Sequence, residues 1–535
     1  MANAADVIAR RLYEAGCRHA FGIPGGEVLT LIKGLNDAGI AFGLAKHENA
    51  AGFMAEGTHH ANGAPGVLVA TLGPGVANAV NVIANAYQDR VPMIFLTGCV
   101  DAGHALTYTH QIFDHRALLE SVTKATFSVS NGAADVVIDK AVAIAMDDQP
   151  GPVLVDVPIE VAAAEQPDNT VTRRAPPIRG APPAGPRLDT VREWLRGAER
   201  PLLVAGVDAL NQGAEAAVAA FARQQGIPLL TTYKAKGVLP EDDPLSLGAA
   251  GLSPKADALL LALVDKSDLV ILAGYDPIEM RAGWCDPWPA ATRVLELCAV
   301  ANTHYVHQAT HSFIGDIGAG LAALGEAIAP RPRWAGGEAR ATRAALHSAF
   351  AAGDAWGPAA VIDVARRVLP RETVASVDTG AHRILLSQMW ECYAPRTLLQ
   401  STGLCTMGCA LPLAMGYKQA HPQRHVIAFV GDAGLEMVLG ELATLRDLGL
   451  AVIVVVFVDE SLALIELKQR GVGHANLGVD FGASDFAGLA SAFGLHGAWA
   501  DDRETLEGEL VAALERPGAS VIASRIGAKS YDGMF

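Results

Sequence analysis

Two aspartates follow two apolar segments of strand length in the last quarter of the sequence. Residues 428–431 (AFVG) run into Asp432, and residues 452–458 (VIVVVFV) run into Asp459. The residues between them are helix-like, so we expect two adjacent parallel strands whose carboxyl ends meet at one sheet edge. Two carboxylates there could hold one hard cation, and Gly434 would let an anion approach closely. The spacing is equally consistent with a helix cap at Asp432 and a turn residue at Asp459.

Three further segments carry polar side chains where chemistry is possible. Glu48 follows a predicted strand and opens an Ala/Gly-rich helix, which alone is ordinary helix-dipole chemistry. Residues 71–81 (TLGPGVANAVN) form a Gly-Pro-Gly turn leading into a helix, which could bind an anion or only turn the chain. Residues 110–115 (HQIFDH) place two histidines in a predicted loop, where they are either ligands or solvated.

Length and composition indicate which elements must position these residues. The chain of 535 residues is 51% hydrophobic and 18% charged, which is typical of a well-packed α/β enzyme of several domains. A formal net charge of −16 argues against nucleic acid or an anionic membrane surface as a partner. The N-terminal residues have the pattern of an amphipathic helix rather than a signal, and no apolar run of about 20 residues occurs. We therefore expect a cytoplasmic protein without a membrane span.

Short apolar runs alternate with Ala-rich helical stretches in three blocks. We predict an α/β fold of three doubly wound parallel-sheet domains at residues 1–170, 188–330 and 350–535. Residues 173–187 and 329–343 are rich in Pro, Gly and Ala and are predicted to separate the blocks. The first and third blocks share a rhythm of strand, glycine-rich turn and long helix, which is consistent with an ancient duplication.

Five segments, taken in order, resemble one family. The pattern is similar to that of thiamine diphosphate (ThDP) enzymes, and within them to the acetolactate synthase-like branch of 2-oxo acid decarboxylases and carboligases. The resemblance implies a pyrimidine-binding, a central and a diphosphate-binding domain. The segments are FGIPGGEVL, KHENAAGFMAEG, TLGPGVANAVNVIANAYQDRVPMIFLTG, GLCTMGCALPLAMG and GDAG…FVDES, which begin at residues 21, 46, 71, 403 and 431.

The resemblance implies a Mg²⁺–diphosphate site in the third domain. Asp432, Asp459 and the carbonyl of Ser461 would be metal ligands, and the diphosphate would complete the octahedron. The remaining residues that the resemblance assigns to the diphosphate are Gly431, Ala433, Gly434 and His382. Two positions depart from the family pattern, because Gly-Asp-Ala replaces Gly-Asp-Gly and Val-Asp replaces Asn-Asn. An altered metal preference is one possible consequence.

The resemblance also implies residues that act on the rings of the cofactor. Glu48 matches the catalytic glutamate that hydrogen-bonds the aminopyrimidine and so activates the cofactor. Met407 matches the apolar residue that holds the cofactor bent, although core packing is the alternative. The carbonyl of Cys405 matches an acceptor for the amino group, and Gln111 matches a catalytic-site glutamine. Cofactor contacts are also expected from Gly73, Pro74 and Asn78.

The implied function is decarboxylation of a pyruvate-like 2-oxo acid followed by carboligation to a second carbonyl. Ile465 stands where some decarboxylases carry an acidic proton donor, which favours carboligation. The alternatives are a simple 2-oxo acid decarboxylase and a catalytically degenerate binding or regulatory subunit. Active sites shared between the subunits of a homodimer or homotetramer are implied. FAD, which some members bind, is disfavoured because residues 204–210 lack a GxGxxG turn.

Overall fold

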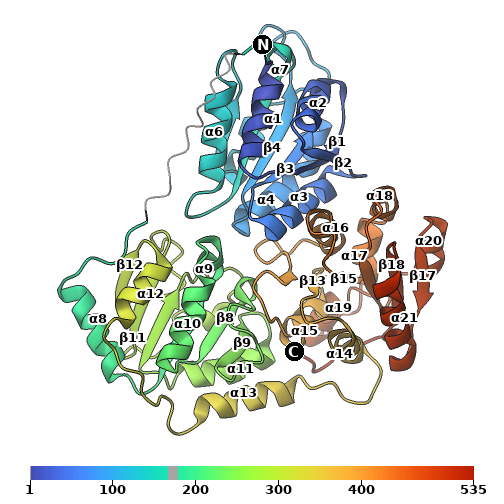
Figure 1. The fold of residues 1–535 in the computed structure, drawn as a ribbon. Coiled ribbons are helices and arrows are strands. Elements are labelled where there is room, and N and C mark those ends of the chain that lie inside the picture. Colours follow the sequence, from blue (N-terminus) through green and yellow to red (C-terminus); the bar gives the residue numbers. More distant parts are fainter. Residues whose placement is uncertain (1, 167–178) are drawn as a thin grey trace.

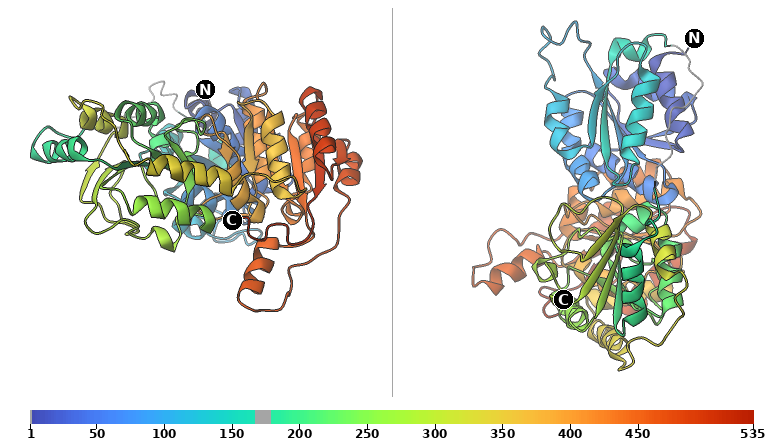
Figure 2. Two further views of the ribbon diagram at one scale, coloured as in Figure 1. Left: turned by 90° about the horizontal axis from the view of Figure 1, so that it is seen from below. Right: turned by 90° about the vertical axis from the view of Figure 1, so that its left-hand side faces the viewer.

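The computed structural model describes residues 2–166 and 179–535, which form three α/β domains (Figure 1). Each domain contains one six-stranded sheet, and all the strand pairs within these sheets are parallel. Helices cover both faces of each sheet (Figures 1 and 2). The predicted fold class is therefore confirmed.

The helices and strands alternate along each domain. The first domain contains α1 Ala4–Glu14, β1 His19–Ile23, α2 Leu29–Asp37, β2 Ala41–Leu44, α3 Glu48–Asn62, β3 Gly66–Ala70, α4 Pro74–Gln88, β4 Met93–Cys99, α5 His115–Leu119, β5 Ala125–Ser128, α6 Ala134–Ala145, β6 Pro152–Pro158 and α7 Ile159–Ala163. The central domain contains α8 Pro186–Gly197, β7 Pro201–Ala205, α9 Val207–Asn211, α10 Glu215–Gln225, β8 Leu229–Thr232, β9 Ser246–Ala250, α11 Pro254–Val264, β10 Leu269–Ala273, β11 Arg293–Cys298, β12 His311–Ile314 and α12 Ile317–Gly325.

The third domain follows the connecting helix α13 Glu338–Ala349. It contains α14 Pro358–Val368, β13 Val374–Val377, α15 Ala381–Met389, β14 Leu398–Leu399, α16 Ala410–Ala420, β15 Val426–Gly431, α17 Asp432–Met437, α18 Glu441–Asp447, β16 Ile453–Val458, α19 Ala463–Gly471, α20 Phe486–Ala492, β17 His496–Trp499, α21 Arg503–Glu515 and β18 Ser520–Arg525. Figure 2 shows α19 and the loop after it standing away from the body of the domain.

The predicted linkers have different outcomes. Residues 173–178 of the first linker lie outside the described residues, and the described remainder is irregular until α8 begins at Pro186. The second linker, 329–343, is irregular only as far as Gly337, because α13 begins at Glu338. Ala and Glu favour helix once the Pro residues have passed. No helix among the described residues is both long and apolar enough to cross a bilayer.

The first and third sheets have the same strand order. Counted from its own first strand, each sheet runs 2-1-3-4-6-5. The central sheet runs 3-2-1-4-5-6, which is the order of doubly wound dinucleotide-binding folds. The shared order agrees with the rhythm that the first and third blocks show in sequence.

Strand residues alternate between two hydrophobic cores. Val67 and Val69 of β3 pack with α1, α2 and α6, whereas Leu68 and Ala70 face α3 and α4. The core on this second face continues through α16 to β15 and β16 of the third domain. One apolar layer therefore joins the first and third domains.

The closest contact in this layer is the crossing of α3 and α16, where glycines allow the backbones to meet. A Cβ atom at Gly57 would overlap the carbonyl oxygen of Leu413, and one at Gly416 would overlap the carbonyl oxygen of Met54. Both obstacles are backbone atoms, which cannot rotate away. The crossing therefore fixes α3, which begins at Glu48, against the third domain.

We predict that Gly416→Ala destabilises the protein, because the helices must separate to admit the methyl group. Overpacking of this kind costs about 1–3 kcal/mol, which a thermal melt should report as a lower Tm. Gly508→Ala is the matched control, since Gly508 lies exposed within α21 with open space at its Cβ position. The control should be neutral or slightly stabilising because Ala is the better helix former. Equal melting of the two variants would contradict a close crossing.

Candidate active site

Asp432 and Asp459 lie at the carboxyl ends of adjacent strands. β15 and β16 pair in parallel, with Gly431 opposite Phe457, so the two aspartates follow at the same sheet edge. Both line one cavity of about 120 Å³. The predicted strand–helix–strand unit is thus present, although its helical part is divided into α17 and α18.

Asp432 organises the turn after β16. Its side chain is 4% exposed, and its Oδ1 accepts the N–H of Ala433 at 2.8 Å. Its Oδ2 accepts the N–H groups of Asp459 at 3.1 Å and Glu460 at 2.7 Å. Burial raises the pKa of Asp432, while these three N–H groups oppose the shift. The prediction that Asp432 caps a helix is wrong, because Asp432 is the first residue of α17 and the N-cap is Gly431. Its side chain holds the turn after β16 and lines the cavity.

The surroundings disfavour the charged form of Asp459 more strongly than that of Asp432. Burial, reinforced by the negative charge of Asp432, raises the pKa of Asp459 to about 7. Asp432 is buried and Asp459 is half-buried, and two neighbouring carboxylates repel each other, so a cation between them would be favoured.

We predict that Asp459→Asn stabilises the cofactor-free protein at pH 8 but not at pH 4.5. The folded pKa of about 7 exceeds the ordinary value of 3.8, so the folded chain holds a proton that the unfolded chain has lost between these values. The penalty for ionising Asp459 therefore grows as pH rises through this window, and Asn avoids it. Thermal melts of both proteins at the two pH values measure the difference. A Tm gap that is the same at both values would contradict the assignment.

His382 and two glycines form another part of the cavity lining. His382 is 5% exposed and stacks on Phe457 with ring centroids 5.4 Å apart. Burial lowers the pKa of His382 to about 3, and among the described residues its Nε2 has no hydrogen-bond partner. A Cβ atom at Gly434 would overlap Oδ2 of Asp378, and one at Gly431 would lie 3.1 Å from the His382 ring. The wall therefore offers a neutral ring nitrogen beside closely packed backbone.

The other predicted cofactor residues of the third domain lie around this wall. Met407 and the backbone of Ala433 line the cavity, and so does Ser461, whose Oγ donates to Asp480 at 2.8 Å. The N–H of Ala433 already donates a hydrogen bond to Asp432. Cys405 is not among the cavity residues; it lies in the preceding loop with a left-handed φ of 56°.

One part of the cavity lining is apolar. It is formed by the start of α19 and by the C-terminal segment, and the side chain of Ile465 is 42% exposed there. Burial raises the pKa of the Tyr531 hydroxyl well above its ordinary value, so this tyrosine stays neutral. The apolar residues on this side are Leu462, Ala463, Leu464, Ile465 and Tyr531.

The first domain holds its own group of predicted residues. Glu48 is 5% exposed at the start of α3, and its Oε2 accepts from Nδ2 of Asn78 at 3.0 Å. Pro74 begins α4 after Gly73, which has a φ of 65°. Gln111 is exposed with a φ of 58°, and its carbonyl oxygen lies where a Cβ atom at Gly73 would be. The structure thus gathers these five residues around the start of α4.

A buried histidine in this group was not predicted. His115 accepts the N–H of Gly73 at 3.2 Å through Nε2, and its Nδ1 lies 3.0 Å from Asp156. Thr97 donates to the same carboxylate. Of the two histidines in the predicted loop, only His110 is exposed. The partner of His115 lies 41 positions away on β6, so no local pattern could have revealed it.

The two groups do not meet within one chain. None of the first-domain residues Glu48, Gly73, Asn78 and Gln111 is among the described residues that line the cavity of Asp432 and Asp459.

The fold and the cavity together are typical of α/β enzymes, which bind their ligands at the carboxyl ends of parallel strands. The chain belongs to the thiamine pyrophosphate enzyme family and is a ThDP-dependent enzyme of the lyase/transferase type, similar to acetolactate synthases. Family models for the N-terminal binding domain, the central domain and the C-terminal binding domain match residues 2–118, 188–324 and 378–524.

Curated relatives match nearly the whole chain. It is 30% identical to acetolactate synthase isozyme 1 large subunit of Escherichia coli (strain K12), over 98% of this chain and 94% of the relative. It is also 30% identical, with the same coverage, to a probable 2-ketoarginine decarboxylase of Pseudomonas aeruginosa. Acetolactate synthase of Bacillus subtilis (strain 168) is 27% identical over 97% of this chain and 92% of the relative.

Proposed function

We propose that the enzyme decarboxylates a small, pyruvate-like 2-oxo acid and joins the remaining fragment to a second carbonyl compound. The observation that carries this proposal is the group of apolar residues around Ile465 in the same cavity as the two aspartates. No acidic side chain stands at this position to deliver a proton, so a second carbonyl has the advantage as the acceptor. Apolar side chains also suit the methyl group of a pyruvate-like substrate.

The residues of the cavity fit a diphosphate carried by Mg²⁺. Asp432, Asp459 and the carbonyl of Ser461 would be the oxygen ligands of the metal. The unpartnered Nε2 of His382 and the close backbone at Gly431, Ala433 and Gly434 would face the diphosphate. When bound, ThDP supplies a carbon nucleophile that adds to the 2-oxo group and accepts the electrons released on decarboxylation.

Residues of two chains would complete each site. Met407 and the carbonyl of Cys405 would hold the rings of a cofactor bound by their own chain. Glu48, with Gln111 and the turn from Gly73 to Asn78, would serve a cofactor bound by the partner subunit, since these residues lie outside their own chain's cavity. A homodimer is then the minimum active unit, and a homotetramer is compatible with it. We favour a site without FAD, because a Cβ atom at Gly206 would overlap the backbone at Gly274 and Tyr275, so the turn after β7 is tightly packed.

A simple decarboxylase is the second candidate function. A relative named as a probable 2-ketoarginine decarboxylase is as similar to this chain as the first acetolactate synthase. Product analysis separates the two candidates. With pyruvate and ThDP–Mg²⁺, we expect a condensation product with a new carbon–carbon bond. Release of the free aldehyde alone, from pyruvate or from longer 2-oxo acids, would favour the decarboxylase.

We predict that Glu48→Gln keeps cofactor binding but lowers turnover by about 10²–10⁴-fold, the usual range for a general acid–base group. The substitution is isosteric and retains an oxygen that can accept from Asn78. Exchange of the thiazolium C2 proton on the bound cofactor, followed by NMR, measures the step directly. Exchange at the wild-type rate would remove Glu48 from the catalytic role.

We predict that Asp432→Ala abolishes Mg²⁺-dependent ThDP binding, because the diphosphate cannot replace the lost ligand. Calorimetry measures the affinity. Glu436→Ala is the matched control, since it removes one negative charge from the exposed side of the same helix. Unchanged affinity in a folded Asp432→Ala protein would mean that Asp432 only holds the turn after β16.

A further inference from the structure

One face of α4 is bonded to the third domain of the same chain. Asn81, Asn85 and Asp89 occur at intervals of four residues, so they lie in one row along the helix and its C-terminal cap. Asn81 accepts from the Thr406 hydroxyl at 2.8 Å, and Asn85 accepts from the Ser401 hydroxyl at 2.6 Å. The row therefore faces residues 401–406, the loop that precedes α16.

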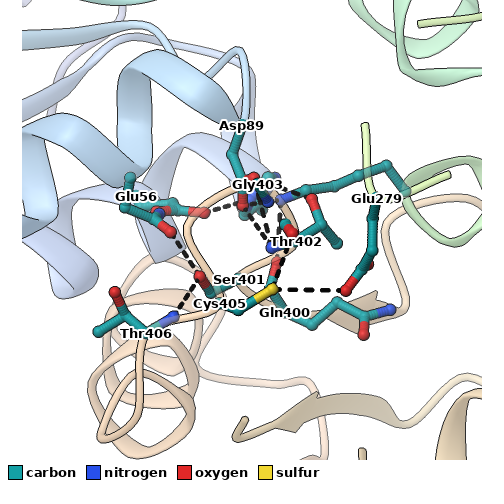
Figure 3. A network of polar contacts seen from close by, with 12 residues as sticks. Glu56, Asp89, Glu279, Gln400, Ser401, Thr402, Gly403, Cys405 and Thr406 are labelled. Atoms are coloured by element: carbon teal, nitrogen blue, oxygen red, sulfur yellow. Dashed lines mark hydrogen bonds and ion pairs between the residues drawn. The ribbon is translucent and has the colours of Figure 1, made fainter. Parts of the chain in front are cut away.

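Asp89 makes the largest share of these contacts (Figure 3). Its Oδ1 accepts the Thr402 hydroxyl at 2.8 Å and the Gly403 N–H at 2.6 Å, while its Oδ2 accepts the Thr402 N–H at 3.0 Å. The side chain is 1% exposed. One buried carboxylate thus fixes two consecutive peptide units of the loop.

The charge of Asp89 is balanced from the central domain. Lys234 Nζ lies 2.7 Å from Asp89 Oδ2 and donates to the carbonyl of Gln400 at 2.9 Å. Burial opposes the charge of Lys234, but Asp89 and Glu56 raise its pKa above the ordinary value. Lys234 therefore stays charged, and the three domains meet at the start of the loop.

The loop needs such support because its conformation is not intrinsically stable. Cys405 has a left-handed φ of 56°, which a side chain other than glycine rarely adopts. Its thiol donates to the Thr402 carbonyl at 3.0 Å, inside the loop itself. On the side of the central domain, Glu279 lies 3.6 Å from the Cys405 sulfur (Figure 3). Glu279 also pairs with Arg383, which donates to the Ser401 carbonyl at 2.7 Å.

The loop leads directly into the cavity. Met407 lines it, and the N–H groups of Gly408 and Cys409 are held by Asp378 at 2.8 and 3.2 Å. A shift of the loop at Thr402 would therefore move Cys405 and Met407, while the wall at His382 and the two aspartates would keep its place.

We propose that the row Asn81–Asn85–Asp89, with Lys234 as the counter-charge, positions residues 401–407 so that Cys405 and Met407 meet the ring end of the cofactor. Asp89 is a positioning residue, since it acts through the loop and does not line the cavity. The inference rests on the proposed ThDP site and adds a requirement to it. The ring end of the cofactor depends on α4, whereas the diphosphate end does not.

The test compares two ligands, ThDP and inorganic pyrophosphate, each with Mg²⁺, by calorimetry on the full-length protein. Asp89→Asn should raise the Kd for ThDP by about tenfold or more, because a hydrogen-bonded charge is lost, and leave the Kd for pyrophosphate within about twofold. Thr402→Val is the milder variant, which removes only the hydroxyl bond to Asp89. It should weaken ThDP in the same direction, again sparing pyrophosphate.

Thr123→Val is the matched control, since it removes one buried hydroxyl bond, to Leu119, from another part of the first domain. It should change neither affinity. Equal weakening of both ligands by Thr402→Val, or unchanged ThDP affinity in that variant, would overturn the positioning role. A wild-type protein that binds pyrophosphate but not ThDP would overturn the proposed function itself, and the positioning role with it.

Discussion

The crossing of α3 and α16 is the contact on which the arrangement of the molecule depends. Gly57 and Gly416 let two helices from different domains approach until backbone meets backbone. The apolar layer around them is continuous from the first sheet to the third. Because α3 begins at Glu48 and α16 follows the loop of Cys405 and Met407, the same contact sets the positions of both groups of candidate active-site residues. Because a packed interface of this kind has few alternative arrangements, the two groups of residues are fixed relative to each other.

The candidate site places charge where the surroundings do not favour it. The buried Asp432 and the half-buried Asp459 lie at one sheet edge, and burial keeps His382 in the same cavity neutral. An isolated protein would be more stable with apolar residues here, but the proposed metal ion and diphosphate would give each of these polar groups a partner. Asp459, which replaces the Asn of the family pattern, adds a negative charge to the proposed metal site. The consequence is a site whose affinity for a divalent cation should be coupled to proton release.

The junction of the three domains uses charge differently. Asp89 and Lys234 form a buried ion pair, and both also make hydrogen bonds to backbone groups of one loop. Such a pair contributes little net stability, but breaking it leaves a buried charge without a partner, so it specifies one loop conformation. The left-handed Cys405 shows that the loop is shaped by its surroundings rather than by its own preferences.

The sequence alone determined the α/β class, the parallel strands and the paired aspartates at one sheet edge, because hydrophobic periodicity and strand-end position are local properties. The order of five motifs added the cofactor class. Only the tertiary structure decided that Asp432 accepts the N–H groups of the turn at Asp459, that His115 binds Gly73, and that Asn81, Asn85 and Asp89 face a loop more than 300 residues away. It also separated Glu48 from the cavity of its own chain. Contacts between distant segments depend on how helices pack and which charges are buried together, and neither leaves a periodic signal in sequence.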